Sequence, residues 1–174
     1  MANTYTLISS VTVGSGGSAT IDFTSIPQTY TDLLLKLSVR GTAAGAHGGS
    51  AQMIFNNSTA SNYSFRNLRG SGSTAISGSA SSVAFIRVTN NHPTAGNTAS
   101  TFGSSEVYIP DYTSSRGKST SEDNAEENNT SESYTQIVAG YWSQNNAITR
   151  ITLTSEATLF SQYSTAYLYG ISNA

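Results

Sequence analysis

The feature that most constrains this chain is a period-two alternation of apolar and polar residues. It is clearest from Asp32 to Arg40, where Leu33, Leu35, Leu37 and Val39 occupy every second position. Successive side chains of a β-strand point to opposite faces of the sheet. We therefore expect one face of this segment to meet a core and the other to be mostly wet. No segment keeps a helical period over three turns, so the pattern predicts an all-β protein.

About ten short segments show strand patterning, at spacings of roughly 8 to 15 residues, which is typical of an antiparallel sandwich or barrel. The first places Tyr5, Leu7, Val11 and Val13 on one face. The last, residues 165–171, is apolar on both faces, which favours a central position in a sheet or a subunit interface. We expect a single domain over residues 1–174. Its predicted fold is an antiparallel β-sandwich of about 8–10 strands in two sheets of four or five, with a jelly roll as the first choice.

Three further segments have distinct patterns. Residues 71–82 are rich in Ser and Gly, and we expect a loop there. Residues 83–89 are predicted to form one strand. Residues 133–143 are predicted to form another, with Ile137 and Tyr141 on the face opposite Trp142.

Charge is scarce, and its scarcity excludes several classes of protein. Charged residues make up 10% of the chain, against about 25% in ordinary domains. Eight Lys and Arg against ten acids make no basic field, so we expect no nucleic-acid partner. The absence of cysteine excludes a disulfide scaffold and a thiol nucleophile. The longest strongly apolar run, Leu33–Leu35, is far short of the roughly 20 residues of a membrane helix, and the start resembles no secretory signal.

Half of the acids lie in one polar segment, residues 122–132. We interpret it as a solvated charge run, part of which forms an edge strand whose charges discourage unwanted pairing. An alternative is a calcium site, since hard cations bind several oxygens, although no EF-hand spacing is present. Its ligands would be Glu122, Asp123, Glu126, Asn128 and Asn129. A second alternative is a carboxylate pair for glycoside hydrolysis, which requires a separation that sequence neighbours rarely provide.

Other catalytic patterns are missing from the sequence. The two histidines, His47 and His92, lie in segments with Gly or Pro and are expected to be exposed loop residues. There is no nucleophile elbow and no phosphate-binding glycine loop. The sequence thus predicts a non-enzymatic protein without catalytic residues, cofactor or metal site.

Tyrosine is the more informative residue type. Ten tyrosines and few lysines resemble the composition of protein interfaces, although tyrosine is also common in strands. The candidate partner-contact residues are Tyr63, Tyr112, Glu126 and Glu127. Tyr63, Tyr112 or Trp142 could also stack on a sugar ring, but core packing is the better explanation for Trp142.

Several short segments form a recurring pattern that covers most of the chain. They are residues 5–10 (YTLISS), 26–33 (IPQTYTDL), 62–63 (NY), 68–70 (LRG), 102–112 (FGSSEVYIPDY) and 167–171 (YLYGI). Together they resemble small virion proteins of tailed phages, especially those of cyanobacterial and marine hosts. Such proteins are similar to jelly-roll capsid decoration (cement) proteins, and some lie among tail or fibre genes. The acidic segment 122–132 departs from this pattern.

The resemblance implies a function that fits the composition. The protein would bind the assembled shell, through the major capsid protein or other virion proteins, and stabilise it by mass action. It would be made in the bacterial cytoplasm and lie on the particle exterior as a homo-oligomer, with a trimer natural at a symmetry axis. An alternative is a tail or tail-fibre component that contacts the host surface through glycans. A third alternative is a hydrolase acting on capsule. No membrane partner is expected.

Overall fold

The computed structural model describes residues 4–45, 49–129, 133–156 and 159–172. Within these ranges the chain forms strands, turns and loops, with no helix. The strands are β1 Tyr5–Thr12, β2 Thr20–Phe23, β3 Asp32–Val39, β4 Gly49–Phe55, β5 Tyr63–Gly70, β6 Ala75–Val83, β7 Ile86–His92, β8 Gly103–Ile109, β9 Lys118–Glu126, β10 Tyr134–Trp142, β11 Ile151–Ser155 and β12 Thr165–Ile171.

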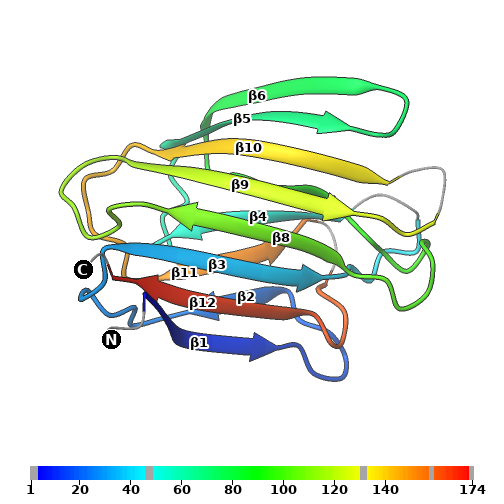
Figure 1. The fold of residues 1–174 in the computed structure, drawn as a ribbon, viewed down its shortest axis with the longest axis horizontal. Helices are drawn as coiled ribbons and strands as arrows, with labels where there is room; N and C mark the ends of the chain where they lie inside the picture. Colours follow the sequence, from blue (N-terminus) through cyan, green and yellow to red (C-terminus); the bar gives the residue numbers. More distant parts are fainter. Residues whose placement is uncertain (1–3, 46–48, 130–132, 157–158, 173–174) are drawn as a thin grey trace.

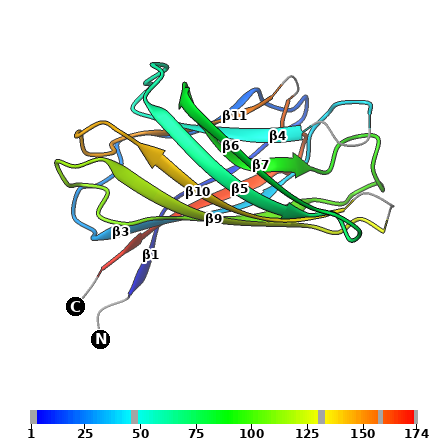
Figure 2. The same cartoon turned by 90° about the horizontal axis from the view of Figure 1, so that it is seen from above.

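The strands form two antiparallel sheets that pack face to face, which confirms the predicted β-sandwich (Figures 1 and 2). The larger sheet has the order β1-β12-β3-β8-β9-β10-β5-β6, and the smaller one has the order β2-β11-β4-β7. The predicted division into two sheets of four or five strands is wrong, because one sheet has twice as many strands as the other.

The unequal sheets arise from two insertions in a jelly roll. Without β5–β6 and β9–β10, the first sheet would read β1-β12-β3-β8 and the second β2-β11-β4-β7. These are the two sheets of an eight-stranded jelly roll, which pair the first, last, third and sixth strands and the second, seventh, fourth and fifth. Both inserted pairs extend the same sheet beyond β8. We call β1, β12, β3 and β8 the framework half of this sheet, and β9, β10, β5 and β6 the inserted half.

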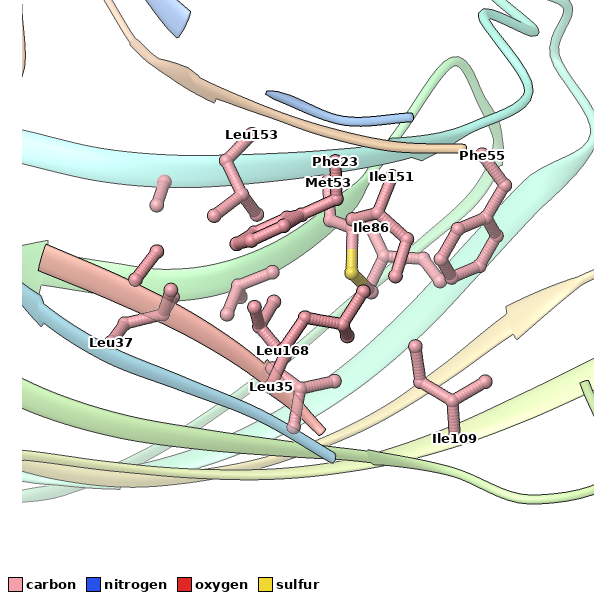
Figure 3. Close-up of a cluster of buried hydrophobic side chains, with 14 of the residues drawn as sticks. Phe23, Leu35, Leu37, Met53, Phe55, Ile86, Ile109, Ile151, Leu153 and Leu168 are labelled. Carbon is pink, nitrogen blue, oxygen red and sulfur yellow. The ribbon is translucent and has the colours of Figure 1, made fainter. Parts of the chain in front are cut away.

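Apolar side chains from both sheets fill the space between them (Figure 3). Leu35 and Leu168 reach inward from the framework half, while Met53 and Leu153 reach inward from the smaller sheet. The alternation predicted for residues 32–40 is confirmed on this side. On the opposite face Lys36 and Ser38 are exposed as expected.

Two residues expected on the wet face of β3, Leu34 and Arg40, are buried. Arg40 is covered by the loop that follows β7, and its guanidinium donates to the carbonyls of Asn97, Thr98 and Thr101 at 2.8–3.3 Å. These contacts tie the loop to the end of β3. Burial lowers the pKa of Arg40.

The predicted common face of β1 is wrong because the strand contains a β-bulge. Pairing with β12 shifts between Leu7 and Ser9. The extra residue reverses the alternation, so Leu7 and Tyr5 are exposed, whereas Val11 packs against the core and Val13 is buried. The prediction that the last strand is central is confirmed, since β12 lies between β1 and β3.

The chain between β5 and β8 also differs from prediction. Residues 71–82 were expected to form a loop, but most of them form β6, which pairs with β5. The single strand predicted over residues 83–89 is instead divided between the end of β6 and the start of β7. Ser82, in a left-handed conformation with φ of 54°, stands just before this change of sheet.

The acidic segment does not provide an edge strand. Its first part is the C-terminal half of β9, which lies inside the larger sheet between β8 and β10. Alternate residues of β9 are buried and exposed along its whole length. The prediction failed because β9 has an all-polar sequence apart from one alanine, so its alternation cannot be seen from hydrophobicity.

Candidate interaction surface

The face of the larger sheet that points away from the smaller sheet carries exposed large side chains. We call it the outer face. Strand register places one row of residues across six strands of it: Tyr167, Lys36, Glu106, Asp123, Ile137 and Leu68. Ile137, Leu68 and Tyr141 expose 59%, 49% and 42% of their surface. Apolar groups this exposed, and grouped on one face, are typical of binding surfaces.

The outer face is hollowed above the junction of the two halves. A hollow of about 470 Å³ lies over β8, β9, β10 and β5, between Arg66, Leu68, Tyr108 and Ile137. A second hollow of about 480 Å³ lies over β12, β3, β8 and β9 and is lined by Lys36 and aromatic residues. Glu106 and Asp123, paired across β8 and β9, line both hollows. The two hollows therefore lie side by side with Glu106 and Asp123 between them, and together we call them the depression.

Hydrogen bonds fix the position of Tyr108 at the side of this depression. Its hydroxyl donates to Asp32 Oδ2 at 2.9 Å, and the Asp111 amide donates to Asp32 Oδ1 at 2.8 Å. The hydrogen bond to Asp32 raises the pKa of Tyr108. The ring is thus held with an ordered hydroxyl and a partly exposed face, as stacking on a partner requires.

An exposed ion pair lies between the two hollows. Lys36 Nζ is 2.7 Å from Glu106 Oε2, and this contact raises the pKa of Lys36. Exposed pairs of this kind add little stability. Asp123 is the other acidic residue of this row. Its cross-strand neighbours are Glu106 and Ile137, so no lysine lies next to it in the row.

Beneath the outer face, β9 buries two carboxyl groups between the sheets. Glu122 accepts a hydrogen bond from Thr120 Oγ1 at 2.7 Å, and burial raises its pKa to about 8. Glu126 accepts one from Asn128 Nδ2 at 2.8 Å, and burial raises its pKa to about 7. The second oxygen of each carboxyl has no partner among the described residues. Glu122 is therefore mostly protonated, and so uncharged, at neutral pH.

Of the four candidate contact residues, only Glu127 is exposed. Tyr63 stacks on Trp142 at 6.1 Å between ring centroids, and its hydroxyl lies 2.9 Å from the Phe55 amide. Tyr112 is fully buried and donates to the Pro27 carbonyl. Neither tyrosine offers a ring to a protein or a sugar in this structure, and the core explanation for Trp142 is confirmed.

The calcium alternative is not supported by the geometry. Alternation along the strand turns Glu122 and Glu126 inward and Asp123 outward, so these oxygens do not converge. Glu127 and Asn129 are exposed. In the described parts of the chain, no three acidic or histidine side chains are grouped to hold a metal ion.

A pair of Glu126 and Glu127 is not supported either, since Glu126 is buried while Glu127 is exposed. His92 was expected to be an exposed loop residue, but it is buried at the end of β7, with its ring 6.2 Å from that of Phe160. Burial lowers its pKa. His47 lies outside the described residues.

Comparisons with protein families, with curated proteins and with solved structures find no match. The resemblance to small virion proteins therefore stays a prediction. Over the residues that the structure describes, no helix is long and apolar enough to cross a membrane.

The sequence patterns missed the outer face as a site. Ile137 and Tyr141 were placed together on one face of their strand, which is correct. Both faces of that strand carry large apolar residues, however, so the pattern could not show which of them meets solvent. Leu68 and Tyr108 join the same surface only through the pairing of the inserted strands.

Proposed function

We propose that this protein is a non-enzymatic structural protein that attaches to an assembled protein shell through its outer face. The observation that carries the proposal is a group of exposed apolar and aromatic side chains on the outer face: Ile137, Leu68 and Tyr108 line one hollow, and Tyr141 lies on the same face. Enrichment in aromatic side chains such as Tyr is typical of protein interfaces.

The resemblance to small virion proteins supports the more specific form of the proposal. The shell would then be a phage capsid, and the chain a decoration protein on the particle exterior. A protein that binds only the assembled lattice stabilises it by RT ln(1 + c/Kd), where c is its free concentration, so the stabilisation grows with the logarithm of its concentration over Kd. A surface with few charges also keeps its affinity as salt changes.

Purified particles stripped of the protein, then incubated with the recombinant chain, provide the test. We expect binding to shells in many copies, visible by electron microscopy, and a higher temperature of shell rupture. The I137D variant should fold normally but lose most of this binding, because it places a charge at the centre of the interface. T24D, an exposed change just after β2 in the smaller sheet, is the matched control. Density confined to the tail, or an unchanged rupture temperature, would contradict the shell proposal.

One observation favours a second candidate function, binding of host glycans. Tyr108 and Tyr141 lie on the face that also carries Arg66, Glu106 and Asp123, and aromatic rings beside carboxylates suit sugar stacking and hydroxyl hydrogen bonds. A glycan array would then show binding that Y141A and D123N both abolish. Retention of particle binding in D123N, with no glycan signal from the parent chain, would leave the shell proposal standing.

A further inference from the structure

The two sheets end in four edge strands, three of which carry features that oppose pairing with another chain. β1 is bulged between Leu7 and Ser9, and β2 has only four residues. β7 pairs irregularly with β4 and packs across strands of the larger sheet. Bulges, shortness and coverage are the usual means by which proteins protect sheet edges.

The fourth edge, β6, has nine residues, and its register with β5 shifts only near its end, between Ser81 and Val83. It pairs with β5 in unbroken register from Ala75 to Ser81, and its residues are almost all exposed. It contains no proline and no charged side chain. Figure 1 shows it as the outermost strand of the inserted half, with nothing covering its free side. A long, regular, uncharged edge is a ready template for another strand.

We propose that β6 pairs antiparallel with β6 of a second copy, about a two-fold axis between the two Gly78 residues. The sequence of this strand supports that choice of occupant, because residues 76–80, Ile-Ser-Gly-Ser-Ala, read almost the same in both directions. Two-fold pairing about Gly78 sets Ile76 opposite Ala80 and Ser77 opposite Ser79. Each side chain therefore meets one of similar polarity, and cross-strand pairs of this kind stabilise sheets.

The inner side of the edge offers a partly apolar hollow for the second copy. This hollow of about 430 Å³ beside β6 is lined by Phe65, Ile76, Ala80 and Phe85, and also by Arg69 and Arg87. Ala80 pairs with Phe65, whose ring stacks on Phe85 at 6.3 Å. Ile76 of the second copy would lie opposite Ala80 and so next to this pair of rings. Ile76 is 40% exposed in the single chain, and the contact would bury it.

This pairing goes beyond the proposed function and leaves the outer face free. A two-fold axis between antiparallel strands runs perpendicular to the sheet, so both copies present their outer faces on the same side. The dimer would carry two depressions on one continuous sheet. Two linked sites raise the overall affinity for a repeating surface by effective concentration.

Light scattering after size exclusion of the whole chain tests the proposal. We expect a mass that rises with concentration toward twice 18.2 kDa. The S77K/S79K variant sets like charges opposite each other in both symmetric pairs, and its dimer Kd should rise about tenfold or more. In S77K/S79E each new lysine faces a new glutamate of the other copy, so the dimer should persist. The matched control S10K/T12K adds the same charges to the β1 edge and should leave the mass unchanged.

A mass of one chain at every concentration, or a trimeric mass, would overturn the proposal. So would a dimer that S77K/S79K leaves intact, or one that S77K/S79E splits equally. Hydrogen exchange of the parent chain gives a measurement that needs no variant: exchange at β6 should slow as concentration rises, while exchange at β1 should not. Particle binding by the outer face is read separately with I137D, so failure of one proposal does not imply failure of the other.

Discussion

The framework half and the inserted half of the larger sheet share one continuous ladder, but the inserted half buries more polar side chains. Under the framework half lie apolar residues such as Leu33, Leu35 and Leu168. Under the inserted half lie the aromatic residues Tyr63 and Trp142, but also four almost fully buried polar residues, Glu122, Asn124, Glu126 and Gln136. These polar groups are partly satisfied by hydrogen bonds, for example from Ser105 Oγ of the framework half to Asn124 Oδ1 at 2.7 Å.

This difference indicates that the two halves serve different purposes. The framework half buries mainly hydrocarbon, and burial of hydrocarbon contributes most of the favourable free energy of folding. The inserted half buries the Tyr63–Trp142 pair as well, but its additional buried polar groups offer little net stability. What it adds is surface: much of the hollowed outer face and the uncovered β6 edge belong to it. The candidate function therefore lies mainly on the part of the sheet that the jelly roll does not need.

The largest expected effect on stability comes from a substitution in the core under the framework half. Leu35→Ala removes a fully buried side chain from the centre of β3 and should lower the free energy of unfolding by about 2–5 kcal/mol. Urea unfolding at neutral pH measures it. Ile137→Ala, on the outer face of the inserted half, should change stability by less than about 0.5 kcal/mol. Equal losses would mean that the outer face is not a free surface.

A second prediction concerns the pH dependence of the inserted half. Because the pKa of Glu122 is raised from 4.5 to about 8, the folded state holds a proton that the unfolded state releases. Stability should therefore be highest below pH 4.5, fall as the pH rises toward 8, and then level off. Glu122→Gln removes this loss, so it should stabilise the protein at pH 9 by about 2–3 kcal/mol and have little effect at pH 4.5.

Thermal unfolding of parent and variant across this pH range gives the result. Glu126→Gln should act in the same direction with a smaller effect, since its raised pKa is about 7. A parent protein whose stability is flat between pH 5 and 8 would show that Glu122 is not buried as described.

A third prediction tests how tightly the inserted half packs. A Cβ at Gly140 would lie 2.3 Å from Thr120 Oγ1 and 2.7 Å from Ile86 Cγ2. Gly140→Ala should therefore cost about 1–3 kcal/mol through overpacking. Gly70, on the neighbouring strand β5, has open space where its Cβ would be, and Gly70→Ala should be neutral or slightly stabilising. Chemical denaturation distinguishes the two, and equal effects would contradict the close packing at Gly140.

The smallest effect is expected from the Lys36–Glu106 pair. Both side chains are largely exposed, so their coupling energy should be less than about 0.5 kcal/mol and should shrink with added salt. A double-mutant cycle with Lys36→Met and Glu106→Gln measures this coupling. A larger value would indicate that the depression excludes water more than the structure indicates.

The same comparison explains what could be predicted from the sequence. In the framework half, strands such as β3 alternate apolar and polar residues, so both the all-β sandwich and the jelly roll could be predicted from the sequence. In the inserted half, β6 and β9 contain few apolar residues, and no hydrophobic period marks them. Glu122 is buried because β7, a strand of the other sheet, packs against β9, and local sequence does not show that contact. Tyr63 and Tyr112 have the composition of contact residues, yet local sequence does not show that other strands cover them.

The pairing of β1 with β12 has a consequence for how the protein folds. Tyr5 pairs with Ile171, so the first described strand of the chain finds its partner in the last one. Bringing together two strands so far apart in the sequence costs much chain entropy before their contacts compensate it. Folds dominated by such long-range contacts form slowly. During synthesis β1 emerges before β12 and has no hydrogen-bonded neighbouring strand until β12 has been made. We therefore expect the nascent chain to depend on chaperones, or on fast collapse of the segments between them, to keep β1 from aggregating.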